Sequence, residues 1–326
     1  MELDVEVPSW ARWIVSDATD MDRAPQPVDP AALRRVRLPL PADVYFEYAF
    51  LDGERHMHAD PGNPDRAENT WYPEVSCVRG PDYLTHPLSR PPSDAARGRT
   101  RRLRLDDGAG GRRRVTIYEP DGLTGPAPLL LTHDGTAYQR IARAPAVLER
   151  LIAAGRARPA RLAFLDPIRP EARDREYGFG GAYQRILRDA LVPQLRQEAD
   201  ATGGSFWLGA SLGGLAGLLA ALREPDQVAG VALQSPALLG RPDDPAWYGT
   251  TESWVAAELE RDDGALPWRV YQEVGSLDWL HQVNRRAAEA FARRAERHRF
   301  EVRSAGHNWT FWRDGLAEAL AFLLAP

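Results

Sequence analysis

Ser211 lies between two glycines in the stretch GASLGGLAG, residues 209–217. A G-x-S-x-G pattern also arises by chance, so its meaning depends on the residues around it. The apolar run SFWLGAS predicts a strand that ends at the serine, and LGGLAGLLAAL has the spacing of a helix that follows it. Gly209 and Gly213 supply the small residues that a tight strand-to-helix turn requires. We therefore predict that Ser211 is a nucleophile near the positive end of a helix, with a glycine-rich packing turn as the alternative.

A serine hydroxyl needs a base to remove its proton, and histidine has a suitable pKa. A G-x-S-x-G serine between a strand and a helix is typical of α/β-hydrolases, in which the histidine follows the serine along the chain. The candidates are therefore His281, His298 and His307. His307, in SAGHNW after a predicted strand, is the predicted base. We expect His298 to be a solvated cation at the end of a helix over residues 284–298, and His281 to be a neighbour of the acid.

The acid that orients the histidine should follow the preceding strand, in YQEVGSLDWL. Asp278 comes three residues after Gly275, in the predicted loop, and is our first candidate. Glu273 lies within the predicted strand, where a buried or ion-paired role is expected, and is the second candidate. A turn or helix-capping role is the alternative for Asp278.

The oxyanion formed in acyl transfer needs two backbone N–H donors. One is predicted at Leu212, directly after the serine, and the other at Gly135 or Thr136, in the loop after PLLLTHDG. His133 and Asp134 either shape that loop or simply end the strand.

Composition narrows the class of protein. The chain has 326 residues and a formal net charge of -5, and all 41 of its basic residues are arginine, so we expect no nucleic-acid partner. No apolar run is long enough to span a membrane, and the acidic start MELDVEVPSW has no apolar core of a secretion signal. The single cysteine, Cys77, excludes an internal disulfide and fits a reducing compartment. We therefore predict a cytoplasmic protein; the oligomeric state is open.

Two regions follow from the pattern of apolar residues. Residues 1–95 contain alternating runs such as VYFEYAFLDG, typical of short antiparallel strands, and end in a Pro/Ser-rich linker. Residues 96–326 alternate apolar strands with helical segments, one of them over residues 183–199. This alternation predicts an α/β fold, a mostly parallel sheet with helices on both faces and ligands at the carboxyl ends of its strands.

Several motifs together resemble a known family. The segment YFEYAFLDGERHMHADPGNPDRAEN is similar to immunoglobulin-like early-set domains that precede some hydrolases. The segments LLLTHDG, RDREY, LGASLGGLAGLLAALREPDQV, EVGSLDWLHQVNRRAAEAF and AGHNWTFWRDGLAEAL resemble the enterochelin (ferric enterobactin) esterase-like family, which is allied to esterase D. The resemblance covers nearly the whole chain. It implies an α/β-hydrolase domain over residues 96–326 behind a small immunoglobulin-like domain over residues 1–95.

The same resemblance implies roles for residues of this chain. The nucleophile falls on Ser211, the acid on Asp278 and the base on His307. The R-x-x-E segment at the mouth of the family's site falls on Arg173 and Glu176. The chain also departs from the family, which often has GGHDW where this chain has AGHNW, so Asn308 replaces an acidic residue.

We therefore predict a serine esterase that acts on small-molecule carboxylic esters, with aromatic or catechol esters as candidates, and that needs no cofactor. Aromatic residues of the predicted loops, Tyr138, Phe179, Trp309 and Trp312, are expected to bind substrate or, for the two tryptophans, to pack in the core. Arg173 and Arg175 are expected to meet an anion or to be ordinary surface arginines. The alternatives are an acyltransferase on the same scaffold and a glycan-binding protein with a vestigial hydrolase domain.

The segment HMHAD places His56, His58 and Asp60 on one face of a predicted strand. Three such ligands suit zinc, but the remaining parts of a metallo-hydrolase signature are absent from the sequence. We therefore expect no metal site.

Overall fold

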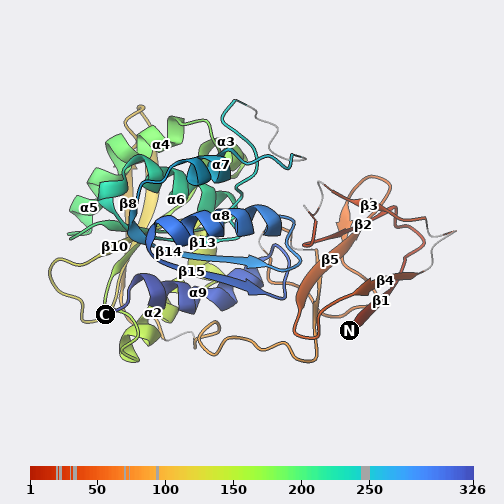
Figure 1. The fold of residues 1–326 in the computed structure, drawn as a ribbon. Helices are drawn as coiled ribbons and strands as arrows, with labels where there is room; N and C mark the ends of the chain where they lie inside the picture. Colours follow the sequence, from red (N-terminus) through yellow and green to blue (C-terminus); the bar gives the residue numbers. More distant parts are fainter. Residues whose placement is uncertain are drawn as a thin grey trace.

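The larger part of the protein is built on one eight-stranded sheet (Figure 1). The computed structural model spans residues 1–326 and describes residues 1–19, 21, 24–29, 31, 35–69, 71–72, 74–92, 95–243 and 250–326. The strand order is β15-β14-β13-β12-β10-β11-β9-β8. The strands are β8 (Arg99–Asp106), β9 (Arg112–Glu119), β10 (Leu129–His133), β11 (Arg161–Leu165), β12 (Ser205–Ala210), β13 (Val228–Gln234), β14 (Leu266–Gly275) and β15 (Ala295–Arg303).

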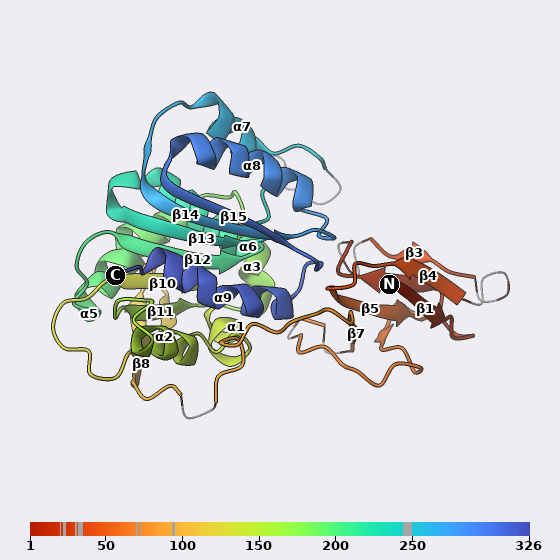
Figure 2. The same cartoon turned by 60° about the horizontal axis from the view of Figure 1, so that its bottom comes forward.

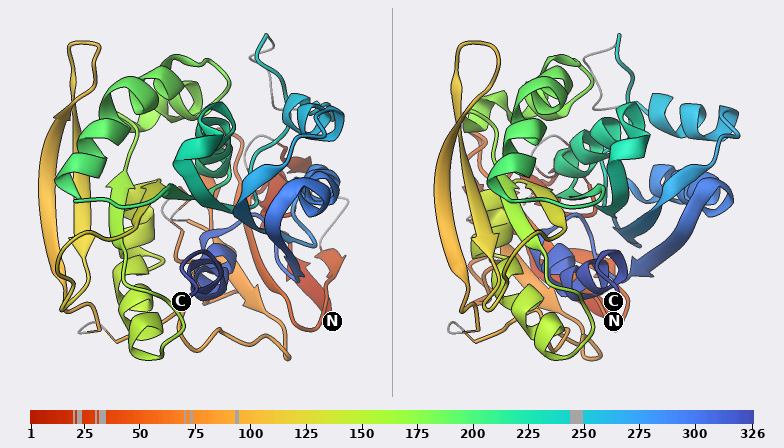
Figure 3. Two further views of the ribbon diagram at one scale, coloured as in Figure 1. Left: turned by 60° about the vertical axis from the view of Figure 1, so that its left-hand side comes forward. Right: turned by 90° about the vertical axis from the view of Figure 1, so that its left-hand side faces the viewer.

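The strands from β10 to β15 run parallel, and the hairpin of β8 and β9 joins them antiparallel through β11. Figure 3 shows this hairpin along one edge of the sheet. Every residue of β10, β11 and β12 is buried, as expected for strands covered on both faces. The predicted mostly parallel sheet is confirmed.

Helices cover both faces of the sheet (Figure 2). They are α1 (Gly135–Arg140), α2 (Ala144–Ala153), α3 (Arg173–Tyr177), α4 (Ala182–Ile186), α5 (Val192–Glu198), α6 (Leu212–Arg223), α7 (Trp254–Arg261), α8 (His281–Arg294) and α9 (Trp309–Leu323). One hydrophobic cluster contains residues of α1, α2 and α9, and a second contains residues of α3 to α8. The sheet therefore separates two cores.

Two predicted helices differ from the structure. The helix expected over residues 183–199 is split into α4 and α5 by a π-helical turn, Leu187–Leu191. The helix expected over residues 284–298 ends at Arg294, and the chain joins β15 at Ala295. There it pairs with β14 in parallel, from Leu266 opposite Ala295 onward. Sheet pairing overrides the helical spacing of the sequence at this point, because propensity is a weak prior against tertiary hydrogen bonding.

The N-terminal region is antiparallel β structure. Two strands, β1 (Glu2–Glu6) and β4 (Arg35–Pro39), form one small sheet. The second sheet contains β2 (Trp13–Ser16), β3 (Gln26–Pro27), β5 (Tyr45–Leu51), β6 (Met57–His58) and β7 (Ser76–Arg79). The domain boundary at residues 95 and 96 stays a prediction, and residues 93–94 of the linker lie outside the described part of the chain.

This N-terminal region lies beside the carboxyl ends of β14 and β15, as Figures 1 and 2 show. Tyr45, the first residue of β5, forms an isolated parallel bridge with Ala305, just past β15. The edge of the sheet at which ligands are expected therefore faces the N-terminal strands. Among the described residues, no helix is long and apolar enough to cross a membrane.

His298 lies on β15 and not at a helix end, which corrects the expectation of a solvated cation. Its ring lies near Phe291 of α8 and stacks with Phe300, at centroid distances of 6.0 and 6.5 Å. Burial lowers the pKa of His298 to about 4, because an apolar environment disfavours the charged imidazole.

We expect an NMR titration of the His298 imidazole to show a midpoint near pH 4, the value to which burial lowers its pKa. A solvated histidine titrates near about 6.5. Because the folded pKa is the lower one, the contribution of His298 to stability is fully present above about pH 6.5 and is lost as the pH falls through the folded pKa. His298→Phe assigns the signal, and a midpoint near that of free histidine contradicts the burial.

Candidate active site

Ser211 occupies the turn between β12 and α6, as predicted. Its backbone has φ 54° and ψ -124°, a conformation that is strained for a residue with a side chain. Its N–H donates to the carbonyl of Gln234 on the neighbouring β13, at 2.9 Å, and its side chain remains 8% exposed. The strain is typical of a nucleophile held at the top of a sheet.

The glycines around Ser211 are needed because backbones approach closely. A Cβ at Gly209 would lie 2.3 Å from the carbonyl carbon of Gly213, and a Cβ at Gly213 would lie 3.0 Å from the Asp134 carboxylate. The turn after β10 therefore lies directly beside the start of α6.

His307 links the predicted nucleophile to the predicted acid. Its Nε2 lies 2.9 Å from Ser211 Oγ, and its Nδ1 lies 2.9 Å from Asp278 Oδ2. The Asp278 side chain is fully buried, and the His307 side chain is 12% exposed. These residues follow β12, β14 and β15, so three strand ends bring together a hydroxyl, an imidazole and a carboxylate. Both ring nitrogens have hydrogen-bond partners, with Asp278 able to accept from Nδ1 and Ser211 able to donate to Nε2.

Asp278 is fixed by its own loop. Its Oδ1 accepts a hydrogen bond from the Leu280 N–H at 2.9 Å, which leaves Oδ2 directed at His307. The neighbouring His281 begins α8, and burial lowers its pKa. The printed contacts place neither His281 nor His298 at Ser211.

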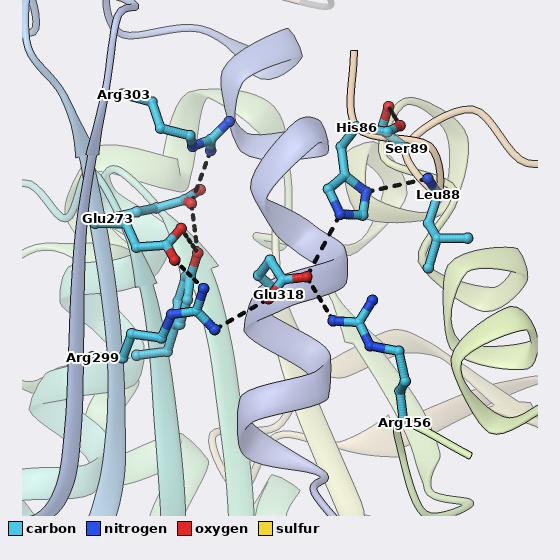
Figure 4. Close-up of polar contacts among 10 residues, drawn as sticks. His86, Leu88, Ser89, Arg156, Glu273, Arg299, Arg303 and Glu318 are labelled. Carbon is cyan, nitrogen blue, oxygen red and sulfur yellow. Dashed lines mark hydrogen bonds and ion pairs between the residues drawn. The ribbon is translucent and has the colours of Figure 1, made fainter. Parts of the chain in front are cut away.

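Glu273, the second candidate for the acid, belongs to a different buried network. Its carboxylate accepts from Gln234 at 2.6 Å, from Arg303 at 2.9 Å and from Tyr271 at 3.0 Å. Figure 4 shows Arg303 turned toward Glu273, on the side of α9. The carboxylate is fully buried, which raises its pKa although Arg303 acts against this. Glu273 therefore supports the sheet beneath the site and does not contact His307.

The same view shows how α9, which follows His307, is anchored further along. Glu318 of α9 accepts from Arg156 at 2.6 Å and from Arg299 at 3.1 Å, and His86 of the linker lies 3.6 Å away (Figure 4). The linker, the loop after α2 and β15 therefore meet on one face of this helix.

Three residues predicted to bind substrate lie instead in the core. Tyr138, Trp309 and Trp312 are all 0% exposed. Tyr138 donates to Gln234 at 2.5 Å, and the edge of Trp312 supports the His307 ring at a centroid distance of 4.9 Å. The prediction that these aromatic residues line the substrate pocket is therefore wrong, because their own packing consumes their surfaces.

Other aromatic residues lie nearer to the site and are partly exposed. Trp279 follows Asp278, and its ring lies 5.9 Å from that of His307. Trp71, from the N-terminal region, packs against Trp309 and Trp312 at 5.3 and 5.6 Å. Sequence reasoning missed Trp71, because a contact across more than two hundred residues leaves no local signal. Phe179 is also partly exposed and packs against Trp254.

Arg173 is held by the protein itself. Its guanidinium makes two hydrogen bonds to the Asp134 carboxylate, at 2.8 and 2.6 Å, and lies 4.8 Å from the Trp71 ring centroid. Glu176, three residues later, is paired in the same bidentate way with Arg113. Arg173 is thus committed to the turn after β10, which corrects the expectation of a guanidinium free to bind substrate. Arg175 is exposed.

The oxyanion donors divide. Leu212 is the first residue of α6, so its N–H has no acceptor within the helix. Gly135 begins α1 in the same way. Thr136 is different, because its N–H and its hydroxyl both donate to Asp166, at 2.9 and 2.6 Å, and this commitment excludes it as the second donor. His133 is a core residue, and burial lowers its pKa to about 3.

The histidines of HMHAD have other partners. His58 Nε2 lies 2.9 Å from Asp52, and Asp60 accepts from the Tyr48 hydroxyl at 2.6 Å. No group of three or more His, Cys, Asp or Glu residues placed to hold a metal is present in the described ranges.

A groove of about 1000 Å³ lies beside this end of the sheet, between the β8–β9 hairpin and the loop after β11. Thr136 and Asp166 line it, together with seven arginines: Arg102, Arg104, Arg112, Arg113, Arg114, Arg140 and Arg169. The groove is thus positive in a chain of net charge -5.

Residues 108–323 match the family model described as "Putative esterase". The chain belongs to this esterase family. It is 29% identical over 288 residues to the iron(III) enterobactin esterase of Dickeya dadantii (strain 3937), a match that covers 82% of this chain and 65% of that protein. The chain thus spans about two thirds of the length of that relative. The resemblance to enterochelin esterases is confirmed.

Solved structures show the same fold. The enterobactin esterase of Shigella flexneri, determined in the presence of enterobactin, superposes with a TM-score of 0.72 at 19% identity and covers 99% of this chain and 92% of its own. A ferulic acid esterase superposes with a TM-score of 0.53 at 17% identity, over 70% of this chain and 98% of its own. The first of these matches includes the N-terminal β region. The predicted α/β-hydrolase fold, with a small β region ahead of it, is confirmed.

We expect Gly209→Ala to destabilise the protein by about 2 kcal/mol or more, because the added Cβ collides with the backbone of α6 and neither can move independently. Gly53→Ala is the matched control, since a Cβ there meets nothing within 4 Å. Chemical denaturation of both variants gives the comparison. Equal stabilities for the two would contradict the close packing of the serine turn.

Proposed function

We propose that this esterase-family chain hydrolyses carboxylic esters through an acyl-enzyme on Ser211, with His307 as the base and Asp278 as the acid. The carrying observation is the continuous hydrogen-bonded path from Ser211 Oγ through both nitrogens of His307 to Asp278, with each distance at 2.9 Å. Nucleophile, base and orienting acid in this order are the parts that covalent acyl transfer requires.

In the first half of the reaction, Ser211 Oγ attacks the ester carbonyl carbon while His307 Nε2 takes the hydroxyl proton. The tetrahedral oxyanion is stabilised by the N–H groups of Leu212 and Gly135, each worth on the order of 3 kcal/mol. Its collapse breaks the bond to the leaving alkoxy oxygen, which receives the proton from His307. The products of this half are the alcohol and an ester between the acyl group and Ser211.

In the second half, a water molecule gives a proton to His307 Nε2 and attacks the acyl carbon. The second tetrahedral intermediate releases the carboxylic acid, and Ser211 Oγ regains its proton from His307. Asp278 stays ionised throughout, holds Nδ1–H and stabilises the imidazolium that forms twice. Each proton taken is returned, so no cofactor enters the reaction.

For the substrate class, we infer an ester of an aromatic or catechol acid. The relatives support this, since one acts on iron(III) enterobactin and another structure is that of a ferulic acid esterase. In this chain, the partly exposed Trp71 and Trp279 are the aromatic surfaces nearest to His307, and flat acyl groups pack favourably on such rings. A cytoplasmic location and a reaction without a cofactor stay predictions from the sequence.

We expect Ser211→Ala to lower kcat by about a million-fold, because the members of such a triad act as a unit. The measurement is turnover of p-nitrophenyl butyrate and of methyl ferulate by wild type and variant in parallel. A variant with wild-type turnover would rule out Ser211 as the nucleophile. Faster acyl transfer to an added alcohol than to water would identify an acyltransferase.

The choice of acid has its own test. Asp278→Asn should lower kcat by about ten thousand-fold, because an amide fixes the wrong tautomer of His307. Glu273→Gln changes a carboxylate of the same strand that does not contact His307, so its kcat at the pH optimum should stay within about threefold of wild type. The reverse result, with Glu273→Gln inactive and Asp278→Asn active, would exchange the two roles.

A further inference from the structure

The loop that carries His307 is held from outside the hydrolase sheet, by the N-terminal β region. The His307 N–H donates to the backbone carbonyl of Asp17 at 2.8 Å. The side-chain amide of Asn308 donates to Asp17 Oδ2 at 2.6 Å. The N–H of Tyr45, at the start of β5, donates to the carbonyl of Ser304 at 3.0 Å. Three contacts therefore clamp residues 304–308 from the N-terminal side.

Asp17 is itself a fixed element of the N-terminal sheet. It follows β2, and its N–H donates to the Glu47 carbonyl on β5 at 3.0 Å. Its Oδ2 accepts from the Glu47 N–H, also at 3.0 Å, and the residue is 0% exposed. A Cβ on Gly306 would lie 2.4 Å from the Asp17 carboxyl carbon. The loop is thus pressed against a rigid support, and the residue before His307 must be glycine.

Asn308 uses both ends of its amide. Its Oδ1 accepts from the Phe311 N–H at 2.8 Å and caps α9, while its Nδ2 donates to Asp17. An aspartate caps a helix equally well but has no proton to donate. The departure from the family pattern at this position thus has a physical reason in this chain, because a carboxylate at 308 would face the Asp17 carboxylate at hydrogen-bond distance.

We propose that the Asp17–Asn308 pair is a positioning device through which the N-terminal β region holds His307 in register with Ser211 and Asp278. This inference rests on the proposed function. Asp17 and Asn308 are positioning residues, since neither contacts the reacting atoms. The N-terminal region then completes the catalytic site and is not a separable attachment to it.

Charges around the pair make it sensitive to an added carboxylate. Asp17 faces Glu47 from β5, Asp278 from the loop after β14, and His307 from its own loop. Arg313 of α9 and Arg79 of β7 act on Glu47 from its other side. Burial, with Glu47 next, raises the pKa of Asp17, and burial raises the pKa of Glu47 to about 7. A carboxylate at position 308 enters this buried group of acids with no new cation.

The test is Asn308→Asp, which keeps the helix cap and removes the donor. At about pH 5.5 the new pair shares a proton and holds the loop, so kcat should stay within about threefold of wild type. As the pH rises to about 9, the pair loses that proton and the two carboxylates repel each other. We expect kcat at pH 9 to fall at least tenfold below wild type, with KM changed less than threefold, because the base and not the substrate site moves.

The double variant Asp17→Asn with Asn308→Asp reverses the direction of the hydrogen bond and restores one donor and one acceptor. We expect it to recover kcat at pH 9 to within about threefold of wild type. Gln227→Glu, an exposed change at the opposite end of the sheet, is the control for one added negative charge and should leave the pH profile unchanged. Thermal unfolding at each pH shows whether a variant is folded.

A readout besides activity separates this inference from the proposed function. The imidazole signals of His307 are followed by NMR in wild type, Asn308→Asp and the double variant. If wild type hydrolyses no ester, the proposed function fails, while a His307 signal that shifts in Asn308→Asp and returns in the double variant still supports the clamp.

Wild-type pH profiles and wild-type His307 signals in Asn308→Asp would overturn the inference. A double variant that folds but stays as impaired as Asn308→Asp at pH 9 would also overturn it, because the defect would then not arise from the paired carboxylates. Where Asn308→Asp is unfolded at pH 9, recovery of both fold and kcat in the double variant supports the clamp.

Discussion

Two hydrogen bonds to one imidazole set the tolerance for the rest of the structure. His307 lies 2.9 Å from both Ser211 and Asp278, and an error of 1 Å in either direction would break one of the bonds. The three residues come from loops after three different strands, and loops alone hold such distances poorly. The strained turn at Ser211, the Leu280 N–H on Asp278 and the clamp on the His307 loop each remove one degree of freedom.

Beneath this constellation lies a buried polar chain that runs across the sheet. The Tyr138 hydroxyl donates to Gln234, whose amide donates to Glu273 and to the carbonyl of Trp312. Glu273 is closed by Tyr271 and Arg303. Buried polar groups are costly unless they are satisfied, and a satisfied network specifies one arrangement. This chain fixes β13, β14 and the start of α9 relative to one another, and with them the loops that carry Asp278 and His307.

A second set of charges fixes the turn after β10. Asp134 lies beside Gly213 and is gripped in bidentate fashion by Arg173, which stacks near Trp71 of the N-terminal region. The N-terminal β region therefore meets the site twice, at the His307 loop through Asp17 and at the turn after β10 through Trp71. Its arrangement explains why the match to an enterobactin esterase structure extends over 99% of the chain and not over the hydrolase sheet alone.

The sequence by itself determined the sheet, the order of its elements and the positions of Ser211, Asp278 and His307, because apolar runs and the glycine-flanked turn are local signals. It failed where a residue's role depends on what packs against it. Tyr138, Trp309 and Trp312 have the composition of a binding wall but spend their surfaces in the core, and Arg173 and Thr136 are consumed by Asp134 and Asp166. Residues 295–298 carry a helical pattern, yet pairing with β14 makes them a strand. The contact of Asp17 with His307 and Asn308 spans almost the whole chain, so only the tertiary structure decided it: no periodicity or motif encodes which distant backbone will meet a loop.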